Sequence, residues 1–541
     1  MSDGATFEGP PLGSMGEVGA LTLGDFLLEV AARFGEAEAV VLDDPLRNGE
    51  TVRWTYRDLL EQSERVAAAL VADGLEPGAV VAVLMGNRPE ALAATFGIAL
   101  AGGVAAPLST FASPDELRSM LARSGAVALL TQERMRDRRF GDEVEAMRAD
   151  LPALRWVAVL GTAAWADRLP PTPTRSDPAR RAAPGDLGLI IFSSGTTSEA
   201  KGVLHAHRSP CLQFWQLAAV FGRHERTRMF SALPLFWTAG LSTAVGATLA
   251  GGGCWVAQEA FDATTALALM ARERVTEPYT LPHQTTALAE RPEWAATDLS
   301  AMTCVYGKSA YARHPSVHGD PGWIMPVGYG LTETSSFACA HPSSTPREQA
   351  KVGAGRLLPG TRMRVVDPAT GEVLPPGQEG ELAVAGLTLM LGYLGRPAEE
   401  AFDADGFFHT GDAGHVDPDG LVHFSGRRTE MIKTGGANVS PAEVEVALRA
   451  CAEVKLSRIV GVPDPRLDEV VVACIVPADG ASPTEGGIQD FLRGRIASYK
   501  VPKRVLFFAD GEIPMTTSDT KVRDAELLAL VQDRLTSTGA R

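Results

Sequence analysis

The chain has 541 residues, of which 45% are hydrophobic and 21% charged, and its formal net charge is −16 at pH 7. This length exceeds a single hydrophobic core, so we expect two or more domains. The acidity argues against a nucleic-acid partner or an anionic membrane surface, because both bind basic patches. From Gly426 onward the chain has 16 basic and 16 acidic residues, so the preceding part carries the whole net charge.

The six cysteines include no C-x-x-C pair, which predicts neither a disulfide framework nor a structural zinc site. The first twenty residues lack the basic start and apolar core of a signal peptide, so we expect a cytoplasmic protein. Two uncharged segments, 91–110 and 234–258, are long enough to span a bilayer. Glycines interrupt both segments, and each ends in a strand-like run. A packed helix, a glycine turn and a buried strand therefore explain them better than a membrane span.

In chain order, residues 55–74 have the periodicity of an amphipathic helix, 79–85 form an apolar strand-like run, and 88–103 form the next helix. Such alternation predicts a parallel, doubly wound sheet. A connector rich in proline and arginine, 168–186, leads to the apolar run 187–192, which reads as a buried strand. Residues 360–386 alternate in the way typical of a small antiparallel unit.

A second boundary is expected near the segment 426–436. Beyond it, Ser440 is suited to cap a helix that begins at Pro441, and 458–464 and 469–479 read as strands. We therefore predict an α/β protein with two domains. The large N-terminal domain, 1–427, would hold doubly wound sheets and the antiparallel β unit, and a small mobile α+β lid would occupy 428–541.

The stretch "FSSGTTSEAKGV", residues 192–203, combines small hydroxyl side chains, a glycine and one cation, Lys201. Backbone cradles for phosphate are built from these parts. It is not a Walker A loop, because Ala200 stands in place of the second glycine and Gly202 in place of the magnesium-binding Ser or Thr. A polar surface turn is the alternative. The strand-like run that leads directly into the loop favours a phosphate site.

Three later segments bear on this choice: "VGYGLTETS" at 327–335, "HTGDAG" at 409–414, and the lysine-bearing segments "SYKVPKRV" and "PMTTSDTKVR" near the end. Each alone is weak. In this order, together with the loop, they resemble the acyl-adenylate-forming superfamily of acyl-CoA synthetases, beetle luciferases and peptide-synthetase adenylation domains. The resemblance extends from about Leu23 to Arg523 and is closest to stand-alone carboxylic acid–CoA ligases.

The resemblance implies an ATP site. The loop would hold the β- and γ-phosphates, although Ser198 and Ala200 depart from the family pattern. Tyr329 would lie against adenine, and Asp412, with Arg427 nearby, would bind the ribose. The implied ATP-binding residues are Ser193, Ser194, Gly195, Thr196, Thr197, Lys201, Gly307, Ser309, Tyr329, Gly330, Thr332, Glu333, Asp412, Arg427 and Lys521. Tyr329 as a turn residue and Asp412 as a helix cap are the alternatives.

For catalysis the resemblance implies that Thr196 and Glu333 hold Mg²⁺ and that Lys521 acts on the developing charge. Attack of a carboxylate on the α-phosphorus accumulates negative charge, which a cation must offset where water is excluded. The segment before Lys521 is one residue longer than the family pattern and lacks its glycine. Arg523 is the nearest rival to Lys521 for this role.

After adenylation, the lid of such enzymes rotates to present a different face to the thiol. The implied hinge is Thr429, where relatives have a charged residue. The implied tunnel for coenzyme A includes Lys433, Gly435 and Gly436, whose glycines allow close approach of backbone to a narrow ligand.

The acid pocket is expected at Trp237 and Gly330. Trp237 stands where relatives commonly have histidine, and it cannot pair the ammonium of an α-amino acid as an aspartate would. An apolar lining favours an aliphatic or aromatic acid. Lys308 and Ser309 also depart from the pattern, and Lys308 is either a contact or simply solvated.

The resemblance thus implies an AMP-forming ligase of fatty or aryl acids that uses ATP, Mg²⁺ and coenzyme A. Free coenzyme A is the expected acceptor, because no carrier-protein module follows Lys521. An enzyme that passes the acyl group to an amine or to a separate carrier protein is the alternative. A non-catalytic sensor is disfavoured by the retention of Lys201, Glu333 and Lys521. The expected partner is a small carboxylic acid, and a homodimer is left open.

Overall fold

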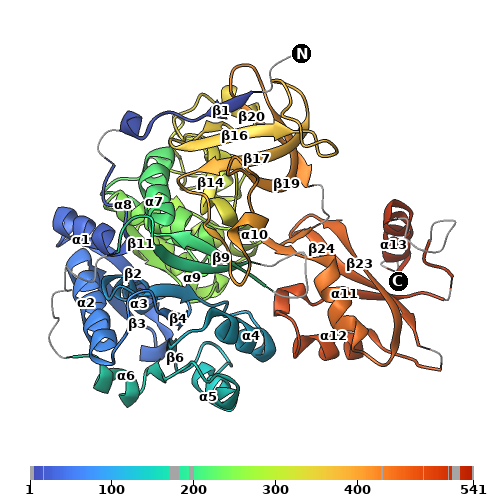
Figure 1. The fold of residues 1–541 in the computed structure, drawn as a ribbon, viewed down its shortest axis with the longest axis horizontal. Coiled ribbons are helices and arrows are strands. Elements are labelled where there is room, and N and C mark those ends of the chain that lie inside the picture. Colours follow the sequence, from blue (N-terminus) through green and yellow to red (C-terminus); the bar gives the residue numbers. More distant parts are fainter. Residues whose placement is uncertain are drawn as a thin grey trace.

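A computed structural model describes residues 5–15, 18–170, 182–193, 200–427, 431–478, 480–509, 511–514 and 524–538. Most of the chain forms one large body, and residues from 431 onward form a smaller lobe at its side (Figure 1). The helices of the large body are α1 (Leu23–Phe34), α2 (Tyr56–Ala72), α3 (Pro89–Leu100), α4 (Pro114–Ser124), α5 (Phe140–Ala146), α6 (Ala163–Arg168), α7 (Arg208–Phe221), α8 (Ala247–Ala250), α9 (Ala263–Arg272) and α10 (Pro282–Ala289).

The largest sheet has seven strands. Their spatial order is β18 (Gly392–Tyr393), β9 (Lys201–Ala206), β8 (Leu187–Ser193), β5 (Val104–Pro107), β4 (Val80–Leu84), β6 (Ala128–Gln132) and β7 (Trp156–Leu160). From β8 to β7 all neighbours are parallel, as the alternating pattern predicted. The sheet is not wholly parallel, however, because β9 returns antiparallel to β8. The short connection between these two strands cannot make the crossover that a parallel pair requires.

A second sheet lies beside the first. Its order is β12 (Glu277–Pro278), β10 (Arg228–Ser231), β11 (Cys254–Ala257), β2 (Glu38–Asp44) and β3 (Glu50–Thr55), with only β3 antiparallel to its neighbour. The two long uncharged segments are accounted for by these sheets. Segment 91–110 contains most of α3, a glycine turn and β5, and 234–258 contains the π-helix η5 (Ala239–Gly246), α8 and β11. Among the described residues, no helix combines the length and apolarity needed to cross a membrane.

Two antiparallel sheets complete the large body. One joins β13 (Val327–Leu331), β14 (Ser336–His341) and β15 (Arg356–Leu357). The other has the order β1 (Thr6–Glu8), β16 (Thr361–Val366), β17 (Gly380–Gly386), β19 (Phe408–Val416) and β20 (Val422–Arg427), so the predicted antiparallel unit is confirmed. In Figure 1 this sheet caps the end of the large body that carries the N-terminus.

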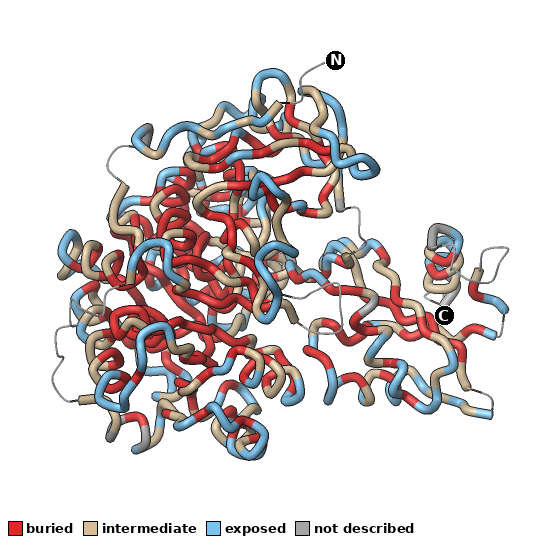
Figure 2. Tube along the Cα trace, viewed as in Figure 1, coloured by how far each residue is buried: buried red, intermediate tan, exposed pale blue. Residues whose placement is uncertain are grey.

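The smaller lobe has its own sheet and core. Its strands are β21 (Ile432–Thr434), β22 (Ala437–Val439), β23 (Val454–Asp464), β24 (Asp468–Pro477) and β25 (Arg504–Phe507), and its helices are α11 (Pro441–Arg449), α12 (Glu485–Arg493) and α13 (Asp524–Thr538). As predicted, the Ser440 hydroxyl caps α11 by accepting from the Glu443 N–H. Figure 2 shows buried residues inside each body. A boundary between residues 427 and 428 stays a prediction.

Arg88 is a charged residue buried inside the large body. Its guanidinium is 1% exposed and bonds three carboxylates: Asp44 Oδ2 at 2.8 Å, Glu90 Oε2 at 3.0 Å and Glu259 Oε1 at 2.6 Å. Burial of this arginine is tolerated because each of its three guanidinium nitrogens donates to a carboxylate. Burial also raises the pKa of Glu259, against the lowering effect of Arg88.

Replacement of Arg88 by methionine should leave these buried carboxylates without their cation. We expect Arg88→Met to lower the free energy of unfolding by about 3–5 kcal/mol, measured by denaturant titration. Arg139 pairs with Glu133 and Asp142 at the surface, so Arg139→Met should cost less than about 1 kcal/mol. Equal losses in the two variants would contradict this view of the core.

Two buried histidines on and after β9 make stability depend on pH. Burial lowers the pKa of His205 to about 4, against a weaker raising effect of the Thr332 backbone. Burial likewise lowers the pKa of His207 to about 4, against the charges of Asp186 and Asp25. Between pH 6.5 and 4 the unfolded chain therefore binds protons at these rings that the folded chain does not bind.

Stability should fall as the pH falls through this window, by about 1.4 kcal/mol per pH unit for each histidine. His205→Gln removes one of these two rings, so the unfolded variant should take up one proton fewer over this pH range. The unfolding free energy of this variant, relative to that of the wild type, is then expected to rise steadily from pH 6.5 to 4.5 in denaturant titrations. A difference that stays constant with pH would show that His205 titrates alike in both states.

Candidate active site

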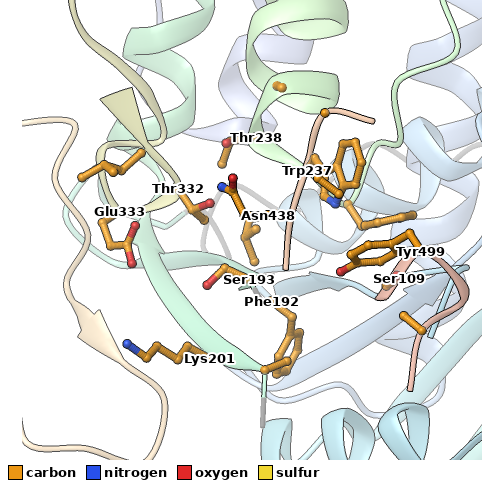
Figure 3. A pocket seen from close by; sticks show the side chains of 18 of the residues that line it. Ser109, Phe192, Ser193, Lys201, Trp237, Thr238, Thr332, Glu333, Asn438 and Tyr499 are labelled. Carbon is orange, nitrogen blue, oxygen red and sulfur yellow. The ribbon is translucent and has the colours of Figure 1, made fainter. Parts of the chain in front are cut away.

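A cavity of about 350 Å³ lies where β8, β9, the segment from β13 to η8 (Thr332–Thr334), the start of η5 and the smaller lobe meet. We call it the central cavity. Residues that the sequence had singled out and that line it are Ser193, Lys201, Trp237, Gly330, Thr332, Glu333 and Gly436. Figure 3 shows Lys201 and Glu333 at one side of this cavity, and Trp237 and Tyr499 at the other.

The charged side is built on strand pairing. In the β8–β9 ladder Ser193 lies opposite Lys201, so the ends of the loop 194–200 are held together. The Tyr393 hydroxyl donates to Glu333 Oε1 at 2.8 Å, and Lys201 Nζ lies 5.2 Å from the centre of the Tyr393 ring. Tyr393, which no motif pointed to, therefore links the cation and the carboxylate. An ammonium, a carboxylate and the Thr332 hydroxyl around one cavity suit a polyphosphate with a divalent cation.

A tight turn presents Thr332 and Glu333 to the cavity. A Cβ atom at Gly330 would lie 1.7 Å from the Ser336 carbonyl oxygen, so only glycine fits there. After η8 (Thr332–Thr334) the chain reverses through Ser335 and Ser336, whose φ angles are 59° and 144°. Non-glycine residues rarely adopt such angles, and this strain is typical of functional sites. The Ser336 hydroxyl lies 2.6 Å from that of Thr243 on η5.

The predicted adenine and ribose residues touch each other beside this turn. The Tyr329 hydroxyl donates to Asp412 Oδ2 at 2.8 Å, and its ring stacks on Phe424 with centroids 5.3 Å apart. Burial raises the pKa of Tyr329, and the Asp412 carboxylate raises it further. Asp412 lies inside β19, so it does not cap a helix. It faces Arg427 in the β19–β20 ladder, which places these two residues together as predicted.

The other side of the central cavity is aromatic. Trp237 makes edge contacts with Phe236 and Phe111, with ring centroids 5.9 Å and 6.1 Å apart. It also lines a second cavity of about 660 Å³, which we call the adjoining cavity. Trp237 thus stands in the wall that separates the two spaces, and its indole is accessible from both.

The glycine turn of the smaller lobe is also shared by the two cavities. Gly435 lines the adjoining cavity and Gly436 the central one, with φ angles of 56° and 83°. A Cβ atom at Gly436 would lie 2.8 Å from the Leu281 side chain. Lys433 points elsewhere, with its ammonium 5.7 Å from the centre of the Phe424 ring. The basic residues that line the adjoining cavity are Arg136, Arg138, Arg493 and Lys503.

Some predicted site residues do not line the central cavity, and others lie outside the part of the chain that the structure describes. Gly307 and Ser309 belong to a surface turn, in which the Ser309 hydroxyl donates to the Tyr306 carbonyl. Lys308 in the same turn is exposed, in agreement with the solvated alternative. The predicted residues outside the described part of the chain are Ser194, Gly195, Thr196, Thr197, Thr429 and Lys521, and for Arg427 only the backbone is described.

Sequence reasoning did not assign a role to Asn438, Tyr499 or Lys500, although all three line the central cavity. They come from the smaller lobe, and Figure 3 shows Asn438 between the Thr332 and Thr238 side chains. Asn438 follows the glycines of the implied coenzyme A tunnel, and Tyr499 and Lys500 belong to the lysine-bearing segment "SYKVPKRV". Only the docking of this lobe reveals that they face the cavity.

Known proteins are similar to this chain in sequence and fold. The family model described as AMP-binding enzyme matches residues 27–394, and that of its C-terminal domain matches residues 443–520. Feruloyl-CoA synthase from an Amycolatopsis species is 35% identical over 89% of this chain and 94% of its own. Indoleacetate–CoA ligase from Aromatoleum aromaticum is 32% identical over 88% of this chain and 93% of its own.

A solved structure agrees with this relationship. The amide bond synthetase McbA from Marinactinospora thermotolerans superposes with a TM-score of 0.74 and is 27% identical, covering 93% of this chain and 99% of its own. The family predicted from the loop and the three later motifs is thereby confirmed. Since the family model extends over most of the chain and a 35% identical relative over 89% of it, this chain belongs to the AMP-binding enzyme family.

Proposed function

We propose that this chain is an AMP-forming ligase that joins an aromatic carboxylic acid to coenzyme A. The observation that carries the proposal is the central cavity, which has Lys201 and Glu333 at one side and aromatic rings around Trp237 at the other. The first side suits the phosphates of ATP and the second an apolar acid. The relatives named for feruloyl-CoA and indoleacetate both act on aromatic acids, in agreement with this polarity.

The donor set at Glu333 fits a magnesium ion. Mg²⁺ is commonly held by one or two carboxylates together with substrate phosphates, rather than by a cage of protein ligands. Glu333 supplies such a carboxylate in the cavity, and Thr196 is the second residue implied by the family. A bound Mg²⁺ would neutralise charge on the polyphosphate. The Tyr393 hydroxyl, bonded to Glu333 at 2.8 Å, orients the carboxylate for this task.

The first reaction step would join the acid to ATP. A carboxylate oxygen of the acid attacks the α-phosphorus, the bond from this phosphorus to pyrophosphate breaks, and an acyl-adenylate remains. Lys201, which lies opposite Ser193 and lines the cavity, is proposed to bind the departing phosphates. Asp412 and Tyr329 are proposed to exchange their mutual hydrogen bond for contacts with the nucleoside. Lys521 is proposed to stabilise the charge that develops at the α-phosphate.

The second step would pass the acyl group to a thiol. The sulfur of coenzyme A attacks the acyl carbon, the thiol gives up its proton, and AMP leaves with the electrons of the acyl–phosphate bond. The adjoining cavity meets the central one at the Gly435–Gly436 turn, and its arginines and Lys503 suit the phosphates of coenzyme A. These features support coenzyme A as the acceptor over a free amine.

Pyrophosphate release from ATP, measured across a panel of acids with and without coenzyme A, tests the proposal. We expect arylpropenoic and arylacetic acids to turn over faster than straight-chain acids, with continued turnover only when coenzyme A is present. The product should be identified as a thioester by mass. Because McbA, an amide bond synthetase, shares the fold, a matched series should contain amines in place of coenzyme A. Turnover with amines alone would replace the proposal by amide synthesis.

Trp237 should control which acids fit. Loss of its indole in Trp237→Ala would open the wall between the two cavities, so bulkier acids should gain relative to smaller ones. We expect the ratio of kcat/KM for a bulky acid to that for benzoate to rise by about tenfold or more. The Trp294→Ala variant is the matched control, because this half-buried indole packs on Tyr311 and His314 away from both cavities.

Thermal unfolding of both variants should be recorded alongside the kinetics. A common decrease of kcat/KM for every acid, in parallel with a lower Tm, would mean that Trp237 only contributes packing. A higher KM for coenzyme A with no change in acid preference would instead assign the indole to the acceptor channel.

A further inference from the structure

A buried lysine joins the two bodies of the protein. Lys500 ends the short helix η11 (Ser498–Lys500) of the smaller lobe, and its side chain is only 4% exposed. Its ammonium donates to Glu443 Oε1 at 2.6 Å, on α11 of the same lobe. It also donates to Glu116 Oε1 at 2.9 Å, on α4 of the large body. The Lys500 ammonium is therefore shared between Glu443, which belongs to the same lobe, and Glu116, which lies across the interface.

Glu116 also caps the start of α4, which fixes the position of its side chain. It is the third residue of α4 and forms a capping box, in which its Oε2 accepts from the Ser113 N–H at 2.7 Å. The other oxygen, Oε1, is directed to Lys500. The Ser113 hydroxyl in turn donates to the Arg495 carbonyl of the smaller lobe at 3.2 Å. The first turn of α4 is thus the docking point for this lobe.

The docked lobe completes the central cavity. Next to Lys500, the Tyr499 ring makes an edge contact with Phe111 of the large body, with centroids 6.1 Å apart. Gly436 and Asn438 of the lobe line the same cavity. This orientation places the glycine turn between the central and adjoining cavities, which is the arrangement that transfer to coenzyme A would use in the proposed function.

A second ion pair crosses the interface but is of a different kind. Arg466 of the lobe pairs with Glu290 at the end of α10, and both side chains are 57% exposed. Exposed pairs of this kind contribute little, because water and salt screen them. A buried charge-assisted bond is stronger and cannot be replaced by water without a rearrangement. The geometry therefore singles out Lys500 as the contact that decides the orientation of the lobe.

We propose that Lys500 is a positioning residue for acyl transfer: its bridge from Glu443 to Glu116 holds the smaller lobe in the orientation that presents Gly436 and Asn438 to the acyl-adenylate. The proposal rests on the proposed function for the identity of the transfer step. Adenylation depends on Lys521 in a different orientation of the lobe, as the family resemblance implies. The bond to Glu116 is available only in the docked orientation, whereas that to Glu443 persists within the lobe.

Glu116→Gln is the decisive variant. Glutamine is accepted at this position of a capping box, so the cap on Ser113 and the fold of α4 should be kept while the charge facing Lys500 is lost. With the best acid of the panel, we expect acyl transfer from a supplied acyl-adenylate, in a single turnover, to slow by about tenfold. Pyrophosphate release in the first turnover should change by less than about twofold, because adenylation does not use this contact.

Glu290→Gln, which removes the exposed pair across the same interface, is the matched control and should leave both steps unchanged. Lys521→Ala should show the opposite split, with slow pyrophosphate release and normal transfer. In a Glu116→Gln, Lys500→Met double variant, transfer should be no slower than in the slower single variant, since both changes break one bridge. Additive losses, or equal slowing of both steps in Glu116→Gln, would overturn the proposal.

Two features keep this test separate from that of the proposed function. Transfer is measured with whichever acceptor, coenzyme A or an amine, the wild-type enzyme uses. In addition, hydrogen exchange of the Lys500 amide, which bonds the Ala497 carbonyl, reports docking without any chemistry. It should become faster by about tenfold in Glu116→Gln and stay unchanged in Glu290→Gln. Unchanged exchange in both variants would overturn the proposal whatever the acceptor.

Discussion

The central cavity depends on the antiparallel pairing of β8 with β9, which places Ser193 beside Lys201 at the two ends of one loop. The chain enters the loop from β8, at the edge of the parallel part of the sheet, and returns at once as β9, so both ends of the loop are fixed. Tyr393 on β18, the next strand, then brings the Glu333 carboxylate toward the same place. A cation and an anion thus both contact one tyrosine, Tyr393. Such an arrangement suits a ligand that carries both phosphate and metal.

A network of buried polar groups supports the wall of the adjoining cavity. Glu259 lines the adjoining cavity and is held by Arg88 at 2.6 Å and by the Gln132 amide at 3.0 Å. A Cβ atom at Gly86 would lie 2.7 Å from Cγ of Glu259, so the backbone passes close to this side chain. Networks of this kind are costly when incomplete and strongly specify one arrangement when complete. The wall of the adjoining cavity therefore rests on a buried network of charges.

The smaller lobe contributes part of the site without belonging to its scaffold. Gly436, Asn438 and Tyr499 reach the central cavity only because the lobe docks against the first turn of α4. The contact includes a buried lysine, Lys500, and an exposed ion pair, Arg466–Glu290. An interface held by polar contacts can be broken and remade more readily than a large apolar one. This fits an enzyme whose two reaction steps need different faces of the lobe.

The sequence alone was sufficient for the family, the α/β class, the antiparallel unit and the helix capped by Ser440, because motifs, hydrophobic periodicity and capping act over short stretches. It also brought Lys201, Thr332, Glu333 and Trp237 into one prediction, and they do line one cavity. Only the tertiary structure decided the antiparallel return of β9, the link through Tyr393 and the bridge from Lys500 to Glu116. These contacts join residues up to 384 positions apart, and no local pattern records which distant side chains the packing brings together.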